Sequence, residues 1–205
     1  MPPRFIYFDL GKVLVDFDVT RMYRQMADVA GIEPSQVREA VFGGGLQRQY
    51  ELGQISGRQF YEAFCRMTGT RPDPRALRLA GSDIFELNPA VLPVVAQLQQ
   101  AGYRLGILSN TCQSHWEHCR SRYRIIREAF EPCTVSYQIG VAKPEARIYL
   151  TAAESAGVRP EEIFFTDDLP DNVAGARAVG FDAVEYRSPS HLAAEFRKRA
   201  VRLNY

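Results

Sequence analysis

The segment RFIYFDLGKVLV, residues 4–15, decides the fold of this chain. Its apolar, β-prone residues from Phe5 to Phe8 are typical of a strand that is buried on both faces of a sheet. The residues Asp9-Leu10-Gly11 that follow indicate a turn directly after the strand. The segment therefore predicts a central parallel strand that ends in a carboxylate.

Two further segments repeat this pattern later in the chain. The apolar run 103–108 ends in Ser109-Asn110-Thr111, and the run 162–166 ends in Asp167-Asp168. In a parallel sheet the loops after the strands meet at the carboxyl edge, where such folds bind their ligands. We therefore expect the polar residues that follow all three strands to lie near one another at that edge.

Helical patterns separate the predicted strands. Asn88-Pro89 supplies an N-cap and a first-turn proline for the first of them, and Gly102 closes it. The predicted helices cover residues 88–102, 144–157, 172–179 and 190–201, and the run 181–186 indicates a further strand. Strands that alternate with helices predict the α/β class, with a three-layer, Rossmann-like and mostly parallel sheet.

The residues between the first two predicted strands behave differently. The stretch 18–86 is rich in helical patterns and contains no convincing strand. The expected helix starts are Asp18 or Thr20, Pro34, and the capping box Ser56-Gly57-Arg58-Gln59. We expect residues 18–86 to form a small helical cap, inserted after the first strand of a core domain made of residues 1–17 and 87–205.

The composition indicates one ordinary globular protein. The 205 residues carry a formal net charge of +1, so neither a nucleic acid nor a membrane surface is expected as a partner. The first residues lack the apolar run of a signal peptide, and no stretch approaches the roughly 20 apolar residues that span a bilayer. We expect a cytoplasmic protein with reduced cysteines.

One short segment contains four residues of the types that bind zinc. Cys112, His115, His118 and Cys119 lie at spacings that gather most of them on one side of a helix. Structural zinc sites, however, usually take two separated pairs of ligands, and here all four residues lie in one short segment. The segment therefore favours an ordinary half-buried helix start.

Four motifs carry the chemistry of the chain when they are taken together. They are FDLGKVLVD with Asp9, LGILSNT with Ser109 and Asn110, GVAKPEARIY with Lys143, and FFTDDLPDNVAGA with Asp167, Asp168 and Asn172. In this order, each after a strand or at a helix start, they resemble the four signature regions of the haloacid dehalogenase (HAD) superfamily. The position of the helical insert resembles the helical-cap subclass of that superfamily.

The resemblance implies a hydrolase that forms a covalent intermediate. Asp9 would be the nucleophile that attacks phosphorus, which divides one difficult hydrolysis into two easier steps. Because a carboxylate and a phosphate repel each other, a bridging Mg²⁺ is expected. The resemblance places this ion on Asp9, on the main-chain carbonyl of Gly11 and on Asp168, whose spacing from Asn172 matches the family.

The resemblance gives the other polar residues supporting roles. Asp167 and Asn172 would orient metal-bound water or support the metal ligands. Ser109 and the amide groups near Asn110 would donate hydrogen bonds to the phosphoryl oxygens. Lys143 would bind the phosphoryl group and neutralise its charge in the transition state, and is therefore expected to act in catalysis.

Gly11 is where the sequence departs from the phosphatases of the family. They usually carry a second aspartate at this position to protonate the leaving group, and such help is typically worth about 10²–10⁴ in rate. Three explanations stay open: a leaving group that needs little protonation, a surrogate acid among Asp18, Asp16 and Lys12, or a loss of turnover. The glycine and the continuation Val15-Asp16-Phe17-Asp18 resemble the bacterial glucose-1-phosphate phosphatase subgroup.

The sequence thus predicts a Mg²⁺-dependent phosphatase that acts on a small phosphorylated metabolite such as a sugar phosphate. Two alternatives stay open: a metal-independent 2-haloacid dehalogenase, and a phosphometabolite- or protein-binding module without turnover. Dehalogenases also lack the second aspartate, but their last signature is normally serine-rich where this chain has Asp167-Asp168, which favours a metal enzyme. The segment Tyr50–Gly53 resembles a cap loop that faces the site, and Trp116 and Tyr123 are expected to pack.

Overall fold

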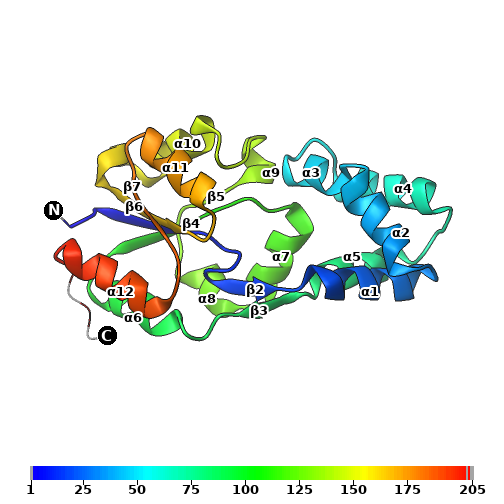
Figure 1. Cartoon of the computed structure of the whole chain (residues 1–205), viewed down its shortest axis with the longest axis horizontal. Helices are drawn as coiled ribbons and strands as arrows, with labels where there is room; N and C mark the ends of the chain where they lie inside the picture. The colour runs from blue at the N-terminus through cyan, green and yellow to red at the C-terminus, as the bar shows by residue number, and fades with distance from the viewer. Residues whose placement is uncertain (1, 202, 204–205) are drawn as a thin grey trace.

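The computed structural model describes residues 2–201 and 203, and its centre is a five-stranded sheet (Figure 1). Neighbouring strands are parallel throughout, in the order β5-β4-β1-β6-β7. The strands are β1 (Phe5–Phe8), β4 (Arg104–Ser109), β5 (Cys133–Val135), β6 (Ile163–Asp167) and β7 (Asp182–Glu185). The predicted α/β class with a mostly parallel sheet is confirmed.

Helices cover both faces of this sheet and complete three layers (Figure 1). Phe5 and Tyr7 pack with residues of α10 and α11, whereas Ile6 and Phe8 pack with residues of α6 and α12. Successive strand residues point to opposite faces, so β1 needs an uninterrupted apolar run between two helical layers. The helices of the core are α6 (Leu92–Gln100), α7 (Gln113–Arg122), α8 (Arg124–Glu128), α9 (Ser136–Ile139), α10 (Ala146–Ala156), the 3₁₀-helix η2 (Pro160–Glu162), α11 (Pro170–Ala178) and α12 (Pro189–Lys198).

The strand order creates a crevice next to β1. The chain places β4 on one side of β1 and β6 on the other, so the loops after these strands diverge at their carboxyl ends. Asp9 follows β1 directly, Ser109 ends β4, and Asp167 ends β6. The topology therefore brings residues from three distant motifs to one edge of the sheet.

A group of helices lies beside the sheet rather than over its faces (Figure 1). They are α1 (Val19–Ala30), α2 (Pro34–Arg38), the π-helix η1 (Glu39–Gly43), α3 (Leu46–Glu51), α4 (Gly57–Thr68) and α5 (Pro74–Ser82), and we call residues 19–82 the helical insert. The three predicted helix starts are confirmed, and α2 begins at Pro34 as expected. The Asp18 side chain accepts a hydrogen bond from the Arg21 N–H, and Ser56 and Gln59 form a reciprocal capping box.

Two short antiparallel strands connect the helical insert to the sheet. They are β2 (Val15–Phe17) and β3 (Phe85–Leu87). The prediction that residues 18–86 contain no strand is wrong at their C-terminal end, because β3 begins at Phe85. Each strand has three residues, which is too short for a period-two pattern to stand out, and their pairing joins Val15 to Leu87, far apart in the sequence.

Asn88 does not cap a helix, although the sequence predicts one from this residue. The helix α6 begins four residues later, and the Asn88 side chain donates to the Val13 carbonyl at 3.0 Å and to the Tyr186 hydroxyl at 3.2 Å. These bonds tie the segment after β3 to the end of β7 and use the amide without a helix. The helix predicted from Asn172 begins at Pro170.

Candidate active site

Three aspartates meet at the carboxyl edge of the sheet. The main-chain N–H of Asp9 donates to the Thr166 carbonyl of β6 at 2.9 Å, which sets Asp9 beside Asp167 and Asp168. One carboxylate oxygen from each aspartate lies within 4.8 Å of the other two. Asp9 and Asp167 are buried and Asp168 is half-buried. The structure therefore brings together the carboxylates that the sequence singled out.

Lys143 lies between two of these carboxylates, although it comes from a different loop. Its ammonium nitrogen is 2.9 Å from Asp9 Oδ1 and 2.5 Å from Asp167 Oδ2, and it donates to the Leu108 carbonyl at 2.9 Å. Its side chain is only 1% exposed. A buried ion pair needs additional hydrogen bonds to offset the desolvation of its charges, and the Leu108 carbonyl supplies one.

Burial and neighbouring charges set the protonation of this group. Burial raises the pKa of the Asp9 carboxyl to about 7, the Lys143 ammonium opposes that rise, and the Asp167 carboxylate adds to it. Burial would lower the pKa of Lys143, but Asp9 and Asp167 together raise it above its ordinary value. Burial, and then Asp167, raise the pKa of Asp168. One ammonium does not balance three carboxylates, so the cluster favours a further cation.

Asp167 and Asp168 differ in what their carboxylates already bind. Asp167 accepts hydrogen bonds from the Leu169 N–H at 2.9 Å and from the Asn172 side-chain amide at 3.0 and 3.1 Å, besides its contact with Lys143. Both of its oxygens are thus occupied by donors. Within the described residues, no other side chain forms a hydrogen bond or an ion pair with Asp168. The carboxylate of Asp168 is therefore the one of the two that can accept an outside ligand.

Ser109 ends β4 and Asn110 follows it, on the other side of Asp9. Ser109 is 2% exposed. The Asn110 side chain accepts a hydrogen bond from the Lys143 N–H at 2.8 Å and donates one to the Lys143 carbonyl at 3.0 Å. These two bonds fix the backbone that carries Lys143. Because these two bonds hold the side-chain amide against Lys143, we expect a contact from Asn110 to a phosphoryl group to come from its main-chain N–H.

A cavity of about 150 Å³ opens beside Gly11, Ser109 and Asn110. Its walls are mostly apolar and come from the sheet loops and from the helical insert. The side chains around it include Phe17, Met22, Phe42, Ile84 and Phe85, together with the polar Gln47, Glu51 and His115. No sequence pattern indicated Gln47, and His115 was indicated only as a possible zinc ligand. We call this space the inner cavity.

The C-terminal end of α3 holds the helical insert against the core. The Ser136 hydroxyl donates to the Glu51 carbonyl at 2.7 Å, and the Ser114 N–H donates to the Tyr50 hydroxyl at 3.2 Å. The segment Tyr50–Gly53 thus reaches the carboxyl edge of the sheet, and Glu51 borders the inner cavity. This position agrees with the expectation that the segment faces the site.

Gly11 lies against an aromatic ring. A Cβ atom placed on Gly11 would approach Cε1 of Phe17 to 3.0 Å, which is closer than ordinary van der Waals contact. The candidate surrogate acids have other partners: Asp18 caps α1, and Asp16 lies 3.6 Å from Lys12 in an exposed ion pair. In the described structure none of these three borders the inner cavity.

The possible zinc ligands do not form a metal site. Among the described residues, the three aspartates are the one group of histidine, cysteine, aspartate or glutamate side chains arranged to hold a metal ion. Cys112 stands at the start of α7, and the His115 ring forms a hydrogen bond with the Gly81 carbonyl at 3.0 Å. Trp116 is buried in the core, and the Tyr123 hydroxyl donates to the Phe85 carbonyl at 2.6 Å, so both aromatics pack as expected.

This arrangement of carboxylates and lysine agrees with the family that the sequence indicates. The sequence profile of the haloacid dehalogenase-like hydrolases matches residues 4–180. The chain therefore belongs to the haloacid dehalogenase-like hydrolase family. The predicted enzyme class, a hydrolase of this family, is confirmed.

The chain is similar to several individual members of this hydrolase family. It is 29% identical over 168 residues to a glyceraldehyde 3-phosphate phosphatase of Methanopyrus kandleri, a match that covers 77% of this chain and 70% of that protein. It is 32% identical over 98 residues to (S)-2-haloacid dehalogenase 1 of a Pseudomonas species, covering 47% and 42%. The HAD family enzyme BT-2542 of Bacteroides thetaiotaomicron, solved with magnesium and inorganic phosphate, is similar with a TM-score of 0.81 and 26% identity, covering 93% and 98%.

Proposed function

We propose that this chain is a Mg²⁺-dependent phosphatase that hydrolyses a small phosphomonoester through an aspartyl-phosphate on Asp9. The observation that carries the proposal is the cluster of three carboxylates with oxygens within 4.8 Å, next to a lysine that is 1% exposed. We also propose that residues 18–86 act as the cap and that residues 1–17 and 87–205 act as the core. The cytoplasmic location stays a prediction.

The donor set fits Mg²⁺. This ion prefers hard oxygen ligands and is usually held by one or two carboxylates, with water and phosphate oxygens completing its shell. Asp9, Asp168 and the Gly11 carbonyl would hold it, because both oxygens of Asp167 already accept hydrogen bonds. When bound, the ion offsets the repulsion between a carboxylate nucleophile and the phosphoryl oxygens. The excess of negative charge around Lys143 supports such an ion.

The residues of the chain divide the reaction into two displacements. The Asp9 carboxylate forms a bond to phosphorus while the P–O ester bond breaks, and the ester oxygen leaves with the electron pair of that bond and takes a proton from water to become an alcohol. Water then attacks the aspartyl-phosphate, releases inorganic phosphate and restores Asp9. Leu10 N–H at 2.7 Å and Lys143 at 2.9 Å hold one oxygen of Asp9 and so orient its carboxylate. Ser109 and the main-chain N–H of Asn110 would hydrogen-bond the phosphoryl oxygens.

Two observations support a phosphatase over the dehalogenase alternative. The acidic pair Asp167-Asp168 stands where the dehalogenase signature is normally serine-rich, and Asp168 is half-buried with its carboxylate still able to accept a ligand. The similarity to the named phosphatase spans more than two thirds of both chains, whereas the similarity to the named dehalogenase spans less than half of each.

Among the described residues, no helix has the length and apolar character to cross a membrane.

A panel of phosphomonoesters tests this proposal. We expect release of inorganic phosphate from at least one sugar, polyol or alkyl phosphate with Mg²⁺ present, and loss of that activity in excess EDTA. The same panel should contain 2-haloacids. Halide release that persists in EDTA, without phosphate release from any ester, would establish the dehalogenase instead. Tight binding of a phosphate ester without turnover would establish a binding module.

Gly11→Asp tests the missing proton donor. An aspartate at this position would protonate the leaving oxygen, so we expect kcat/KM for an alkyl phosphate to rise about tenfold or more. Because the Phe17 ring edge lies 3.0 Å from the new Cβ, the substitution should be made together with Phe17→Leu. For p-nitrophenyl phosphate, whose leaving group needs no proton, we expect little change.

The matched control for this experiment is Gly11→Asn in the same Phe17→Leu background. Asparagine has almost the same shape as aspartate but cannot donate a proton from a carboxyl group. The ratio of alkyl phosphate to p-nitrophenyl phosphate activity should therefore rise for the aspartate variant and stay constant for the asparagine variant. A similar change of this ratio in both variants would rule out missing acid catalysis as the limit on rate.

A further inference from the structure

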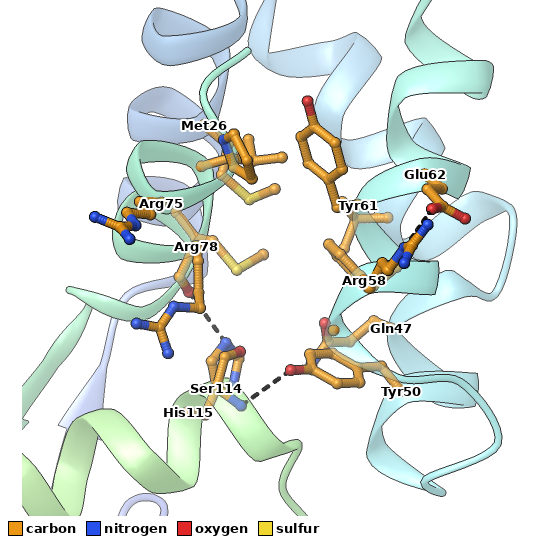
Figure 2. Close-up of a pocket in the computed structure, with 17 residues that line it drawn as sticks. Met26, Gln47, Tyr50, Arg58, Tyr61, Glu62, Arg75, Arg78, Ser114 and His115 are labelled. Carbon is orange, nitrogen blue, oxygen red and sulfur yellow. Dashed lines mark hydrogen bonds and ion pairs between the residues drawn. The ribbon is translucent and has the colours of Figure 1, made fainter. Parts of the chain in front are cut away.

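A second and larger cavity lies within the helical insert. It has a volume of about 520 Å³ and opens between α1 and α5 on one side and α4 on the other (Figure 2). Figure 2 shows Met26 and Tyr61 on opposite walls. The side chains that surround it include Met22, Met26, Val41, Phe60, Tyr61 and Leu77. We call this space the insert cavity, and the residue roles assigned to the Asp9 site do not use it.

The charged residues of the insert cavity stand at its rim. Arg58 is 87% exposed and pairs with Glu62 at 2.8 Å, and Arg78 is 63% exposed and pairs with Glu117 at 3.3 Å. Long arginine side chains line apolar space with their methylene stems while the charged ends stay in water. The interior of the insert cavity is therefore apolar, and its mouth is charged.

Three of the polar side chains that border the insert cavity are already paired within the protein. The Tyr61 hydroxyl donates to the Pro72 carbonyl at 2.8 Å, and the His115 ring binds the Gly81 carbonyl at 3.0 Å. The Gln47 side-chain amide donates to Glu51 at 2.9 Å. Moving a hydroxyl group from water into an apolar cavity costs free energy when it finds no hydrogen-bond partner there. The insert cavity therefore suits hydrocarbon better than the hydroxyl groups of a sugar.

The insert cavity adjoins the inner cavity beside Asn110. Met22, Gln47 and His115 border both spaces. We call these three side chains the partition between the two cavities. One of them, Met22, changes shape easily, because methionine is unbranched and has three rotatable bonds. The two cavities are therefore neighbours, and a molecule that extends from the carboxyl edge of the sheet into the insert cavity would pass these three side chains.

We propose that the insert cavity binds the hydrocarbon tail of the substrate, so that this chain hydrolyses phosphomonoesters of long-chain alcohols. The phosphate would sit at Asp9, the ester oxygen in the inner cavity, and the tail beyond Met22, Gln47 and His115. This inference rests on the proposed phosphatase function and narrows its substrate from phosphorylated metabolites in general to amphipathic ones. It replaces the sugar phosphate that the sequence alone suggests.

A homologous series of alkyl phosphates tests the proposal in the unmodified protein. Ethyl, butyl, hexyl, octyl and decyl phosphate are compared with glucose 1-phosphate and ribitol 5-phosphate, each below its aggregation limit and with Mg²⁺. Once the tail passes the partition, kcat/KM should rise about two- to fourfold per added methylene, the change that burial of one methylene group produces, and then level off. A kcat/KM that does not depend on chain length, or that is highest for a polyol phosphate, would overturn the proposal.

Gly81→Phe is designed to fill the insert cavity. A Cβ on Gly81 would have only Met26 Sδ within 4 Å, at 3.4 Å, so a side chain there projects into open space. Gly81 lies in α5, where phenylalanine is a better helix former than glycine. We expect the variant to lose the gain from octyl and decyl tails while ethyl phosphate is hydrolysed as before. Gly81→Leu is a smaller version that should lose part of the gain.

The matched control is Leu79→Phe, on the same helix. Leu79 is 58% exposed and lies outside the lining of the insert cavity. This variant should keep the full dependence on chain length, and equal losses in the two phenylalanine variants would contradict the proposal. Calorimetric titration with ethyl- and decylphosphonate gives a readout besides turnover: the decyl compound should bind more tightly to the unmodified protein, and Gly81→Phe should remove the difference.

The proposed phosphatase function and the proposed tail site in the insert cavity would fail in different ways. If the phosphatase function is wrong, no phosphomonoester of any length will release phosphate in the presence of Mg²⁺. If only the tail site is wrong, ethyl phosphate or a sugar phosphate will be hydrolysed and the chain-length series will be flat. The comparison of short and long esters therefore separates them.

Discussion

Replacing Asp9 by asparagine is expected to abolish turnover of every phosphomonoester, with a loss of at least about 10⁴-fold in kcat. An amide oxygen is a poor nucleophile, so the first displacement cannot form the aspartyl-phosphate. The other site residues are unchanged in this variant. The residual rate should therefore reflect binding and charge neutralisation without covalent catalysis.

The fold of the Asp9→Asn variant should be retained. Burial raises the pKa of Asp9 to about 7, which means that the folded protein already disfavours the charged form at this position. Asparagine is neutral and has nearly the same shape, and its carbonyl oxygen can still accept the hydrogen bonds from Leu10 and Lys143. We expect a midpoint of urea denaturation no lower than that of the wild type.

Mass spectrometry of acid-quenched protein supplies the direct measurement. During turnover, the wild type should show a peptide carrying one phosphoryl group on Asp9, and the variant should show none. Asp28→Asn is the matched control, because Asp28 is exposed on α1 and the substitution makes the same chemical change. Wild-type turnover by Asp9→Asn, or a phosphoryl group on another residue, would refute the proposed nucleophile.

The sheet was predictable because its signals are local and repeated. The run Phe5–Phe8 is apolar at every position, and in the structure its alternate residues serve two separate cores, one under each helical layer. Periodicity of this kind needs no knowledge of distant partners. The runs that became β4 and β6 carry the same signal, and parallel pairing with β1 brought their polar ends to Asp9.

The short strands could not be predicted in the same way. β5 has three residues, Cys133–Val135, and β2 and β3 have three each, so none is long enough to display an alternation. What makes these segments strands is a partner far away in the chain, as in the pairing of Val15 with Leu87. The role of Asn88 depends on the same distant contacts, because its amide binds the Val13 carbonyl and the Tyr186 hydroxyl rather than a helix N-terminus.

The carboxylates and the lysine of the site could be predicted from sequence motifs. The residues that surround them could not, because their positions depend on how the helical insert packs against the core. Phe17, the last residue of β2, lies against Gly11, and the spacing of the two residues in the sequence does not reveal this contact. Gln47 and His115 reach the inner cavity only because α3 and α7 meet there. Their positions are set by contacts between segments, such as Ser136 with Glu51, that no local pattern encodes.

Replacing Lys143 by methionine is expected to lower both stability and activity. Methionine keeps much of the length of lysine, but Asp9 and Asp167 are left buried without their shared counter-charge. Removing one partner of a buried ion pair typically costs about 3–5 kcal/mol, and we expect a loss of this size in the free energy of unfolding. Loss of the charge opposite the transferred phosphoryl group should lower kcat/KM by about 10²-fold or more. Urea denaturation and steady-state kinetics measure the two effects.

The stability loss should depend on pH in a definite direction. Lys143 opposes the rise in the pKa of Asp9, so its removal should raise that pKa further above about 7. A carboxyl with a raised pKa stabilises the folded state below its ordinary pKa of about 3.9, and this advantage is lost as the pH rises through the raised value. In EDTA, the deficit of the variant relative to wild type should therefore be larger near pH 8.5 than near pH 5. A deficit that is the same at both pH values would contradict this electrostatic account.

An exposed ion pair provides the control for the size of the effect. Arg124 is 83% exposed and contacts Glu128 at 2.6 Å one helical turn away, and such pairs contribute about 0.3–0.5 kcal/mol. Arg124→Met should therefore change stability by less than about 1 kcal/mol, without dependence on pH between 5 and 8.5, and should leave kcat/KM unchanged.

The double variant Lys143→Met with Asp167→Asn separates the structural role of the lysine from its catalytic one. The asparagine removes one of the two stranded charges while a side chain of similar shape stays beside Asn172, so part of the lost stability should return. Activity should not return with it, because the ammonium group of Lys143, which lies beside Asp9, is still missing. Recovery of both together would mean that Lys143 supports the reaction only by holding the fold, and that the charge at Asp9 is balanced by the metal ion alone.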